Sequence, residues 1–166
     1  MKVALVCNNL SFMTGGPRLT FSLAKSLGEF GHKVVIYAPD SGSAHFGDAA
    51  QGLDIRIVKP KSSTKERRPR GLLGWVAGKI RAELQEIALA KTVAESMDSD
   101  FDVVNVHDIA YRVGYFYKKR NPKTKVVWQE NIPLFLYVKR GKLLHDAAGW
   151  GYWLLKRFTD RKYFSA

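Results

Sequence analysis

Two glycines between a short apolar segment and a helical pattern are the first residues whose type and spacing suggest chemistry. Gly15 and Gly16 directly precede Pro17, a residue that suits the first turn of a helix. Backbone N–H groups at a helix N-terminus attract anions, and glycine lets a phosphate approach them closely. The pair therefore predicts a phosphate-binding turn, the alternative being a turn whose glycines only supply a positive φ. Neither a dinucleotide-binding GxGxxG nor a P-loop GxxxxGK[ST] pattern occurs.

A histidine and an aspartate form the second candidate site. His107 and Asp108 follow the apolar segment 103–106, where a buried strand would reach the edge of its sheet. A neutral imidazole at that edge can hydrogen-bond a sugar hydroxyl or a phosphate. The alternative is a His–Asp pair that forms a structural hydrogen bond.

A third group of polar and aromatic side chains follows the apolar pair 126–127. The chain continues with Trp128, Gln129, Glu130 and Asn131. Side chains of these types at the end of a strand are typical of a cleft lining. The alternative is that Glu130 only caps the next segment.

All three candidates depend on short apolar segments that we predict to be strands. These segments are rich in Val and Ile, and near-continuous apolar runs are typical of strands covered on both faces, as in a parallel sheet. The predicted strands are residues 2–7, 33–38, 54–58, 102–107 and 124–129.

Helical patterns separate the predicted strands. They cover residues 17–30, 72–97, 109–120 and 142–163, and the first is followed by Gly31 as a stop. This alternation predicts a Rossmann-like α/β fold: a doubly wound, mostly parallel sheet with helices on both faces. In open sheets of this kind ligands bind beyond the carboxyl ends of the strands, where the candidate residues lie.

The helical period also predicts which apolar side chains of the first two helices face the core. In the first helix they are Leu19, Leu23, Ala24, Leu27 and Phe30. In the second helix they are Leu73, Val76, Ile80, Leu84, Ile87, Ala90 and Ala94.

Three segments, in this order, resemble the N-terminal domain of family-four glycosyltransferases, which are retaining enzymes of the GT-B fold. They are residues 15–18 (GGPR), 27–34 (LGEFGHKV) and 102–108 (DVVNVHD). Residues 154–161 also resemble the helix before the last strand of that domain. Order and spacing agree along nearly the whole chain. One departure is that many relatives carry a histidine at the end of the fifth strand, where this chain has Glu130 or Asn131.

The resemblance implies that residues 1–166 form one acceptor-side domain and that the C-terminal donor-binding domain is absent. It implies a nucleotide sugar as donor substrate, a glycan or lipid-linked acceptor, and no cofactor and no metal. The chain alone is then expected to be inactive. The implied residues are His107, Glu130 and Asn131 for catalysis, Gly15, Gly16 and Arg18 for the donor phosphates, and Asn9 and Asp108 for the acceptor.

The net charge of +12 is concentrated in two segments of the chain. Residues 61–82 carry a net +6 and residues 118–166 a net +9, whereas residues 83–117 between them carry −5. Cations beside interfacial aromatic residues are what a helix on an anionic bilayer needs. The alternative is a solvated helix face, with the aromatics in the core or against the missing domain. The predicted membrane-surface residues are Arg67, Arg68, Arg70, Trp75, Lys79, Trp150 and Trp153.

A basic nucleic-acid-binding module without catalytic activity is the alternative function, because basic patches with aromatic residues can bind single strands. No RRM, KH or helix-turn-helix signature occurs, so nucleic acid is not the expected partner. The single cysteine, Cys7, excludes an internal disulfide, and no Cys/His spacing suits a metal. No apolar run reaches about eighteen residues. The predicted location is cytoplasmic, with peripheral attachment to the inner face of the membrane.

Overall fold

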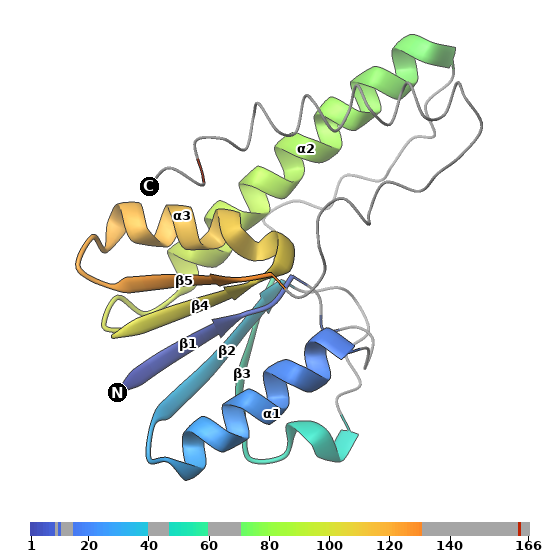
Figure 1. Cartoon of the computed structure of the whole chain (residues 1–166). Helices are drawn as coiled ribbons and strands as arrows, with labels where there is room; N and C mark the ends of the chain where they lie inside the picture. Colours follow the sequence, from blue (N-terminus) through green and yellow to red (C-terminus); the bar gives the residue numbers. More distant parts are fainter. Residues whose placement is uncertain (9, 11–14, 40–46, 60–70, 131–162, 164–166) are drawn as a thin grey trace.

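The computed structural model describes residues 1–8, 10, 15–39, 47–59, 71–130 and 163. Within these ranges one five-stranded sheet forms the centre of the molecule (Figure 1). Its strands are β1 (Lys2–Val6), β2 (Lys33–Pro39), β3 (Asp54–Val58), β4 (Val103–His107) and β5 (Lys125–Gln129). The strand order is β3-β2-β1-β4-β5, and every neighbouring pair is parallel. The five predicted strands are confirmed to within one residue at each end.

Helices lie on both faces of this sheet, which confirms the predicted doubly wound, Rossmann-like α/β fold. Helix α1 (Gly15–Glu29) lies on one face, and α2 (Gly71–Ser96) and α3 (Tyr111–Arg120) lie on the other (Figure 1). Two short 3-10 turns, η1 (Gly47–Ala50) and η2 (Asp108–Ala110), complete the described elements. Of the predicted fourth helix only Tyr163 is described, and it is helical.

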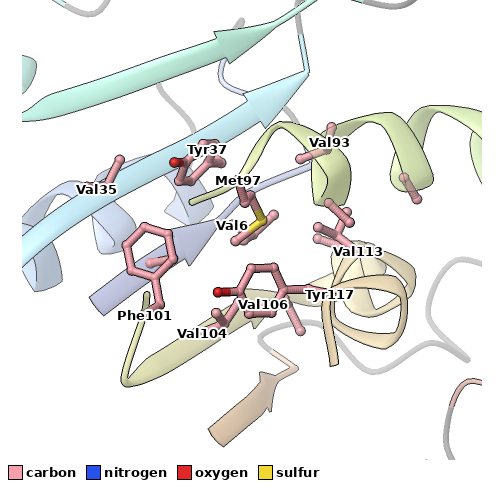
Figure 2. Close-up of a cluster of buried hydrophobic side chains, with 14 residues drawn as sticks. Val6, Val35, Tyr37, Val93, Met97, Phe101, Val104, Val106, Val113 and Tyr117 are labelled. Atoms are coloured by element: carbon pink, nitrogen blue, oxygen red, sulfur yellow. The ribbon is translucent and has the colours of Figure 1, made fainter. Parts of the chain in front are cut away.

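The core has two layers because successive strand side chains alternate between the faces of the sheet. On one face, residues of β1, β2 and β4 converge with residues of α2 and α3, among them Val6, Val35, Val93, Val106 and Tyr117 (Figure 2). On the other face Phe21 and Ala24 of α1 cover the alternate residues of β1 and β2, including Leu5 and Ile36. The central strand β1 is therefore buried on both sides, as its continuous apolar run predicts.

The inward face of α1 is only partly the predicted one, and Leu23 and Leu27 pack against the core as expected. Leu19 is 44% exposed and Phe30 is 80% exposed, so both predictions are wrong, whereas Ala24 is buried as expected. The buried row is Pro17, Thr20, Phe21 and Ala24. The apolar pattern misses this row because it treats Thr20 as an outward residue. Its hydroxyl donates to the carbonyl of Gly16 within the helix, and this bond lets a polar side chain be buried.

Helix α2 matches its predicted bounds to within one residue, but its inward face is only partly as predicted. Ala90 and Ala94 are buried, whereas Val76, Ile80 and Leu84 are exposed. A helix of 26 residues is about 39 Å long, and a strand of 5 residues is only about 17 Å long. Only the C-terminal half of α2 therefore has a sheet to cover, and the N-terminal half extends beyond it (Figure 1).

Candidate functional site

Three of the predicted candidate groups lie at the carboxyl edge of the sheet. Strand β4 pairs with β1 on one side and with β5 on the other, and His107 stands opposite Gln129 at the end of both strands. Gly15 begins the helix that follows β1, and Glu130 directly follows β5. From β1, the strands β2 and β3 extend the sheet to one side, and β4 and β5 extend it to the other side, so the strand order reverses between β1 and β4. Such a switch point, beyond the carboxyl ends of the strands, is where open α/β sheets bind ligands.

The two glycines form the first turn of α1, and neither needs glycine for its backbone conformation. Among the described glycines, only Gly31 and Gly52 have positive φ. The alternative that Gly15 and Gly16 serve a positive-φ turn is therefore wrong. A Cβ atom at either position would meet no atom of the described residues within 4 Å, so close packing against those residues does not require glycine here. Arg18 lies in the same turn and is exposed.

Thr20 links this turn to His107, and sequence reasoning missed it. Its side chain is wholly buried and donates to the Gly16 carbonyl at 3.1 Å. The same hydroxyl oxygen lies 3.1 Å from the Cys7 sulfur and 3.5 Å from Nδ1 of His107. A signal for it was present in the sequence, because a threonine four residues after a helix start can bond back to the first turn.

His107 is buried at the end of β4. It is 3% exposed, and burial lowers the pKa of its imidazole, an effect that the nearby Asp108 carboxylate opposes. The ring is therefore neutral at neutral pH. Burial also raises the pKa of the Cys7 thiol to about 11, so the thiol keeps its proton. The roles predicted for His107 and Asp108 stay predictions.

Asp108 adopts an uncommon backbone conformation. Its φ is +48°, in the left-handed region that aspartate tolerates better than most residues. This residue turns the chain from β4 into η2, so α3 begins at Tyr111 and not at residue 109 as predicted. The Asp108 carbonyl accepts a hydrogen bond of 2.8 Å from Nε1 of Trp128. Residues in such conformations cluster at functional sites.

The predicted cleft lining after β5 divides into two parts. The Trp128 ring is tied to η2 and packs edge to face against Tyr111, with 5.9 Å between the ring centroids. The side-chain oxygen of Gln129 accepts a hydrogen bond of 3.1 Å from the Asn105 amide. Glu130 is exposed, and Trp128 is 37% exposed as well.

A buried arginine at the same edge was also missed by sequence reasoning. Arg112 of α3 is 3% exposed and forms an ion pair with Glu83 of α2, and its guanidinium lies 3.4 Å from Glu86. It lines a small hollow of about 40 Å³ together with Cys7, Asn8 and Pro39, which follow or end their strands. A second hollow, of about 370 Å³, opens at the opposite edge beside Gly28, His32 and Asp54, and no predicted site residue lines it.

Several predicted residues fall outside the described part of the chain. They are Asn9, Asn131, Arg67, Arg68, Arg70, Trp150 and Trp153. Trp75 belongs to α2 without a described side chain, and Lys79 is exposed on the same helix. Among the residues that the structure does describe, no group of three His, Cys, Asp or Glu side chains could hold a metal. In the same residues no helix is long and apolar enough to cross a membrane.

Comparison with known proteins identifies a similar fold. No protein-family model and no curated protein matches this chain. The crystal structure of the glycotransferase of kitacinnamycin matches 98% of this chain with a TM-score of 0.51 and 13% sequence identity. The match covers 40% of that protein, so this chain spans well under half its length. At this identity the likeness shows the fold alone, which is a glycosyltransferase-like Rossmann α/β fold.

Proposed function

We propose that this chain is the acceptor-side domain of a retaining glycosyltransferase of the family-four type, built as one half of a GT-B fold. The observation that carries the proposal is the meeting of Gly16, Thr20 and His107 at the switch point of a glycosyltransferase-like sheet. The substrates are a nucleotide sugar and a glycan or lipid-linked acceptor. A donor-binding domain from the same polypeptide or a partner completes the site, and no metal or cofactor is required.

In this proposal the first turn of α1 stabilises the departing diphosphate. Gly15 and Gly16 begin a 15-residue helix and carry N-terminal amides, and their Cβ positions meet no atom of the described residues within 4 Å. Negative charge that develops on the leaving group is stabilised by such amides and by the helix dipole. The exposed guanidinium of Arg18 adds a cation in the same turn. These features are suited to phosphate without a metal ion.

The acceptor and the transferred sugar are proposed to contact the ends of β4 and β5. His107 and Asp108, with Asn9, lie on the acceptor side, and Glu130 or Asn131 orients the transferred sugar. The exposure of Glu130 beside the end of β4 supports this assignment. In same-face transfer the departing phosphate takes the acceptor proton, so this domain needs no strong base.

The test is transfer by the complete two-domain enzyme with donor and acceptor. His107→Ala and Glu130→Ala are each expected to lower kcat by about 10² or more, as loss of a positioning or electrostatic group does. His32→Ala is the matched control, because His32 lies at the opposite edge of the sheet beside the larger hollow. Turnover near that of the control in both variants would contradict the assignment. The purified chain alone is expected to show no transfer.

A second part of the proposal is that the protein acts at an anionic membrane surface. Val76, Ile80 and Leu84 stand four residues apart in α2 and are 41%, 48% and 61% exposed. This spacing places them along one side of the helix, and the exposed cations Lys79 and Arg81 flank them. Lys79 lies three helical turns before Ala90 and therefore on the same side of α2. Ala90 is buried and Lys79 is exposed, as expected if the N-terminal half of α2 extends beyond the sheet.

Vesicle flotation tests the membrane proposal. The chain is expected to float with vesicles that contain phosphatidylglycerol at low salt and not with neutral vesicles. A triple variant with Val76→Asn, Ile80→Asn and Leu84→Asn is expected to lower the fraction of protein bound to vesicles several-fold. Phe30→Asn is the matched control, because Phe30 is an equally apolar exposed residue after α1. No flotation with anionic vesicles would end this part of the proposal. Stronger, salt-dependent binding to oligonucleotides would favour the nucleic-acid alternative.

A further inference from the structure

The hydroxyl group of Thr20 has three neighbours and only one proton to donate. A threonine hydroxyl offers one O–H donor and two lone pairs. The Gly16 carbonyl, at 3.1 Å, can only accept, so it takes the hydroxyl proton. While that bond is made, the Cys7 sulfur at 3.1 Å and Nδ1 of His107 at 3.5 Å can bond the Thr20 oxygen only as donors to its lone pairs.

Both of these neighbours have a proton to give. The raised pKa of the buried Cys7 keeps its S–H. The lowered pKa of His107 keeps its ring neutral, with one proton to place on either nitrogen. A proton on Nδ1 gives Thr20 a hydrogen bond, whereas a proton on Nε2 would place the Nδ1 lone pair against the lone pairs of the Thr20 oxygen.

We propose that Thr20 sets the tautomer of His107: the ring carries its proton on Nδ1, and Nε2 is a hydrogen-bond acceptor. Nε2 is itself buried in the ligand-free chain, so a ligand reaches it only when the surrounding side chains move. A group that then contacts Nε2 must donate: a hydroxyl does so, whereas a nucleotide-sugar diphosphate carries no proton at neutral pH. The Nδ1–H tautomer therefore favours a hydroxyl over a phosphate. That Thr20 is a positioning residue follows from the geometry alone, and the identification of the hydroxyl as that of a sugar rests on the proposed function.

The experiment is nitrogen NMR of the ligand-free chain with ¹⁵N-labelled histidine at neutral pH. The protonated and unprotonated ring nitrogens have well-separated shifts, so the spectrum gives the ratio of the two tautomers at His107. The wild-type chain is expected to show the Nδ1–H form. Thr20→Ser keeps the hydroxyl and is expected to keep that form. Thr20→Val removes it and is expected to shift the ratio towards Nε2–H by about fivefold or more, as loss of one ordinary hydrogen bond does.

The outcome that overturns the proposal is an Nε2–H form in the wild-type chain, or an unchanged tautomer ratio in Thr20→Val. Amide spectra show whether Thr20→Val keeps the fold. If it does not, Thr20→Ala takes its place with the same expectation. Cys7→Ala is the control, because it removes the other donor to Thr20 and leaves the His107 contact in place. No substrate enters this measurement, so failure of the proposed function leaves its result unaffected.

Discussion

The two edges of the sheet use charged and polar side chains in opposite ways. At the amino edge, Lys2, Arg56, Asp98 and Asp100 form an ion network that is partly open to solvent. At the carboxyl edge, His107, Thr20 and Arg112 are buried, and the chain leaves β4 through the left-handed Asp108. Exposed ion pairs contribute little to stability, whereas buried polar groups are costly unless each has its partner. The comparison indicates that the amino-edge pairs add little to stability, whereas the carboxyl edge depends on the pairing of its buried polar groups.

The largest effect is expected from breaking the buried ion pair at the carboxyl edge. Arg112→Met leaves the Glu83 carboxylate buried without its cation, and this is expected to cost about 3–5 kcal/mol of unfolding free energy. Urea denaturation measures it. Arg112→Met with Glu83→Leu is the control, because removing both charges is expected to recover most of the loss. A loss below about 1 kcal/mol in the single variant would mean that this pair behaves like those at the amino edge.

A second substitution tests the packing of the helix that carries Arg112. A Cβ atom at Gly114 would lie 2.9 Å from a methyl of Val126 and 3.2 Å from those of Val106. Gly114→Ala is therefore expected to destabilise the fold by about 1–3 kcal/mol, because valine side chains have little freedom to move aside. Gly28→Ala is the matched control in α1: its Cβ meets nothing within 4 Å, so the change is expected to be neutral or stabilising by up to about 1 kcal/mol. Equal stability of the two variants in urea would contradict this.

Local patterns predicted the strands and most helix ends, because these depend on neighbouring residues. The Val- and Ile-rich runs and the stop at Gly31, which has a φ of +80°, are of this kind. The burial of Thr20 and the pairing of Arg112 with Glu83 were not predictable in the same way. Both depend on residues that only the fold brings together, such as His107, which is 87 positions from Thr20. The candidate residues therefore lie at the strand ends, as the strand predictions implied, and their roles stay predictions, while Thr20 and its contact with His107 were missed.

As the pH falls, the two edges are expected to lose stability in different pH ranges. The pKa of His107 is lowered in the folded protein, so the unfolded chain binds more protons below about pH 6.5. Its contribution to stability is therefore complete above that pH and is lost progressively as the pH falls. Lys2 holds the pKa values of Asp98 and Asp100 below their usual range, so the amino edge loses stability only below about pH 4.

His107→Gln is expected to remove part of the stability difference between about pH 7.5 and about pH 5. Urea midpoints at the two pH values measure this difference. His32→Gln is the control, because His32 lies at the other edge of the sheet. A pH dependence in His107→Gln equal to that of the wild-type chain and of the control would contradict the role of His107 in the loss of stability at low pH.

The smallest effect is expected at the amino edge itself. Arg56 contacts Asp54 at 3.3 Å, Asp98 at 3.0 Å and the Tyr37 hydroxyl at 2.9 Å, but its side chain is 39% exposed. Water and salt already screen these charges, and the carboxylates return to solvent when the cation is removed. Arg56→Met is therefore expected to cost about 0.2–1 kcal/mol, and added salt should reduce that cost. The loss in Arg112→Met should change much less with salt, because Glu83, its nearer carboxylate partner, is buried. Measuring both variants in urea at low and high salt thus decides whether burial, and not the number of ion pairs, distinguishes the two edges. A salt-independent loss at Arg56 as large as that at Arg112 would remove the distinction.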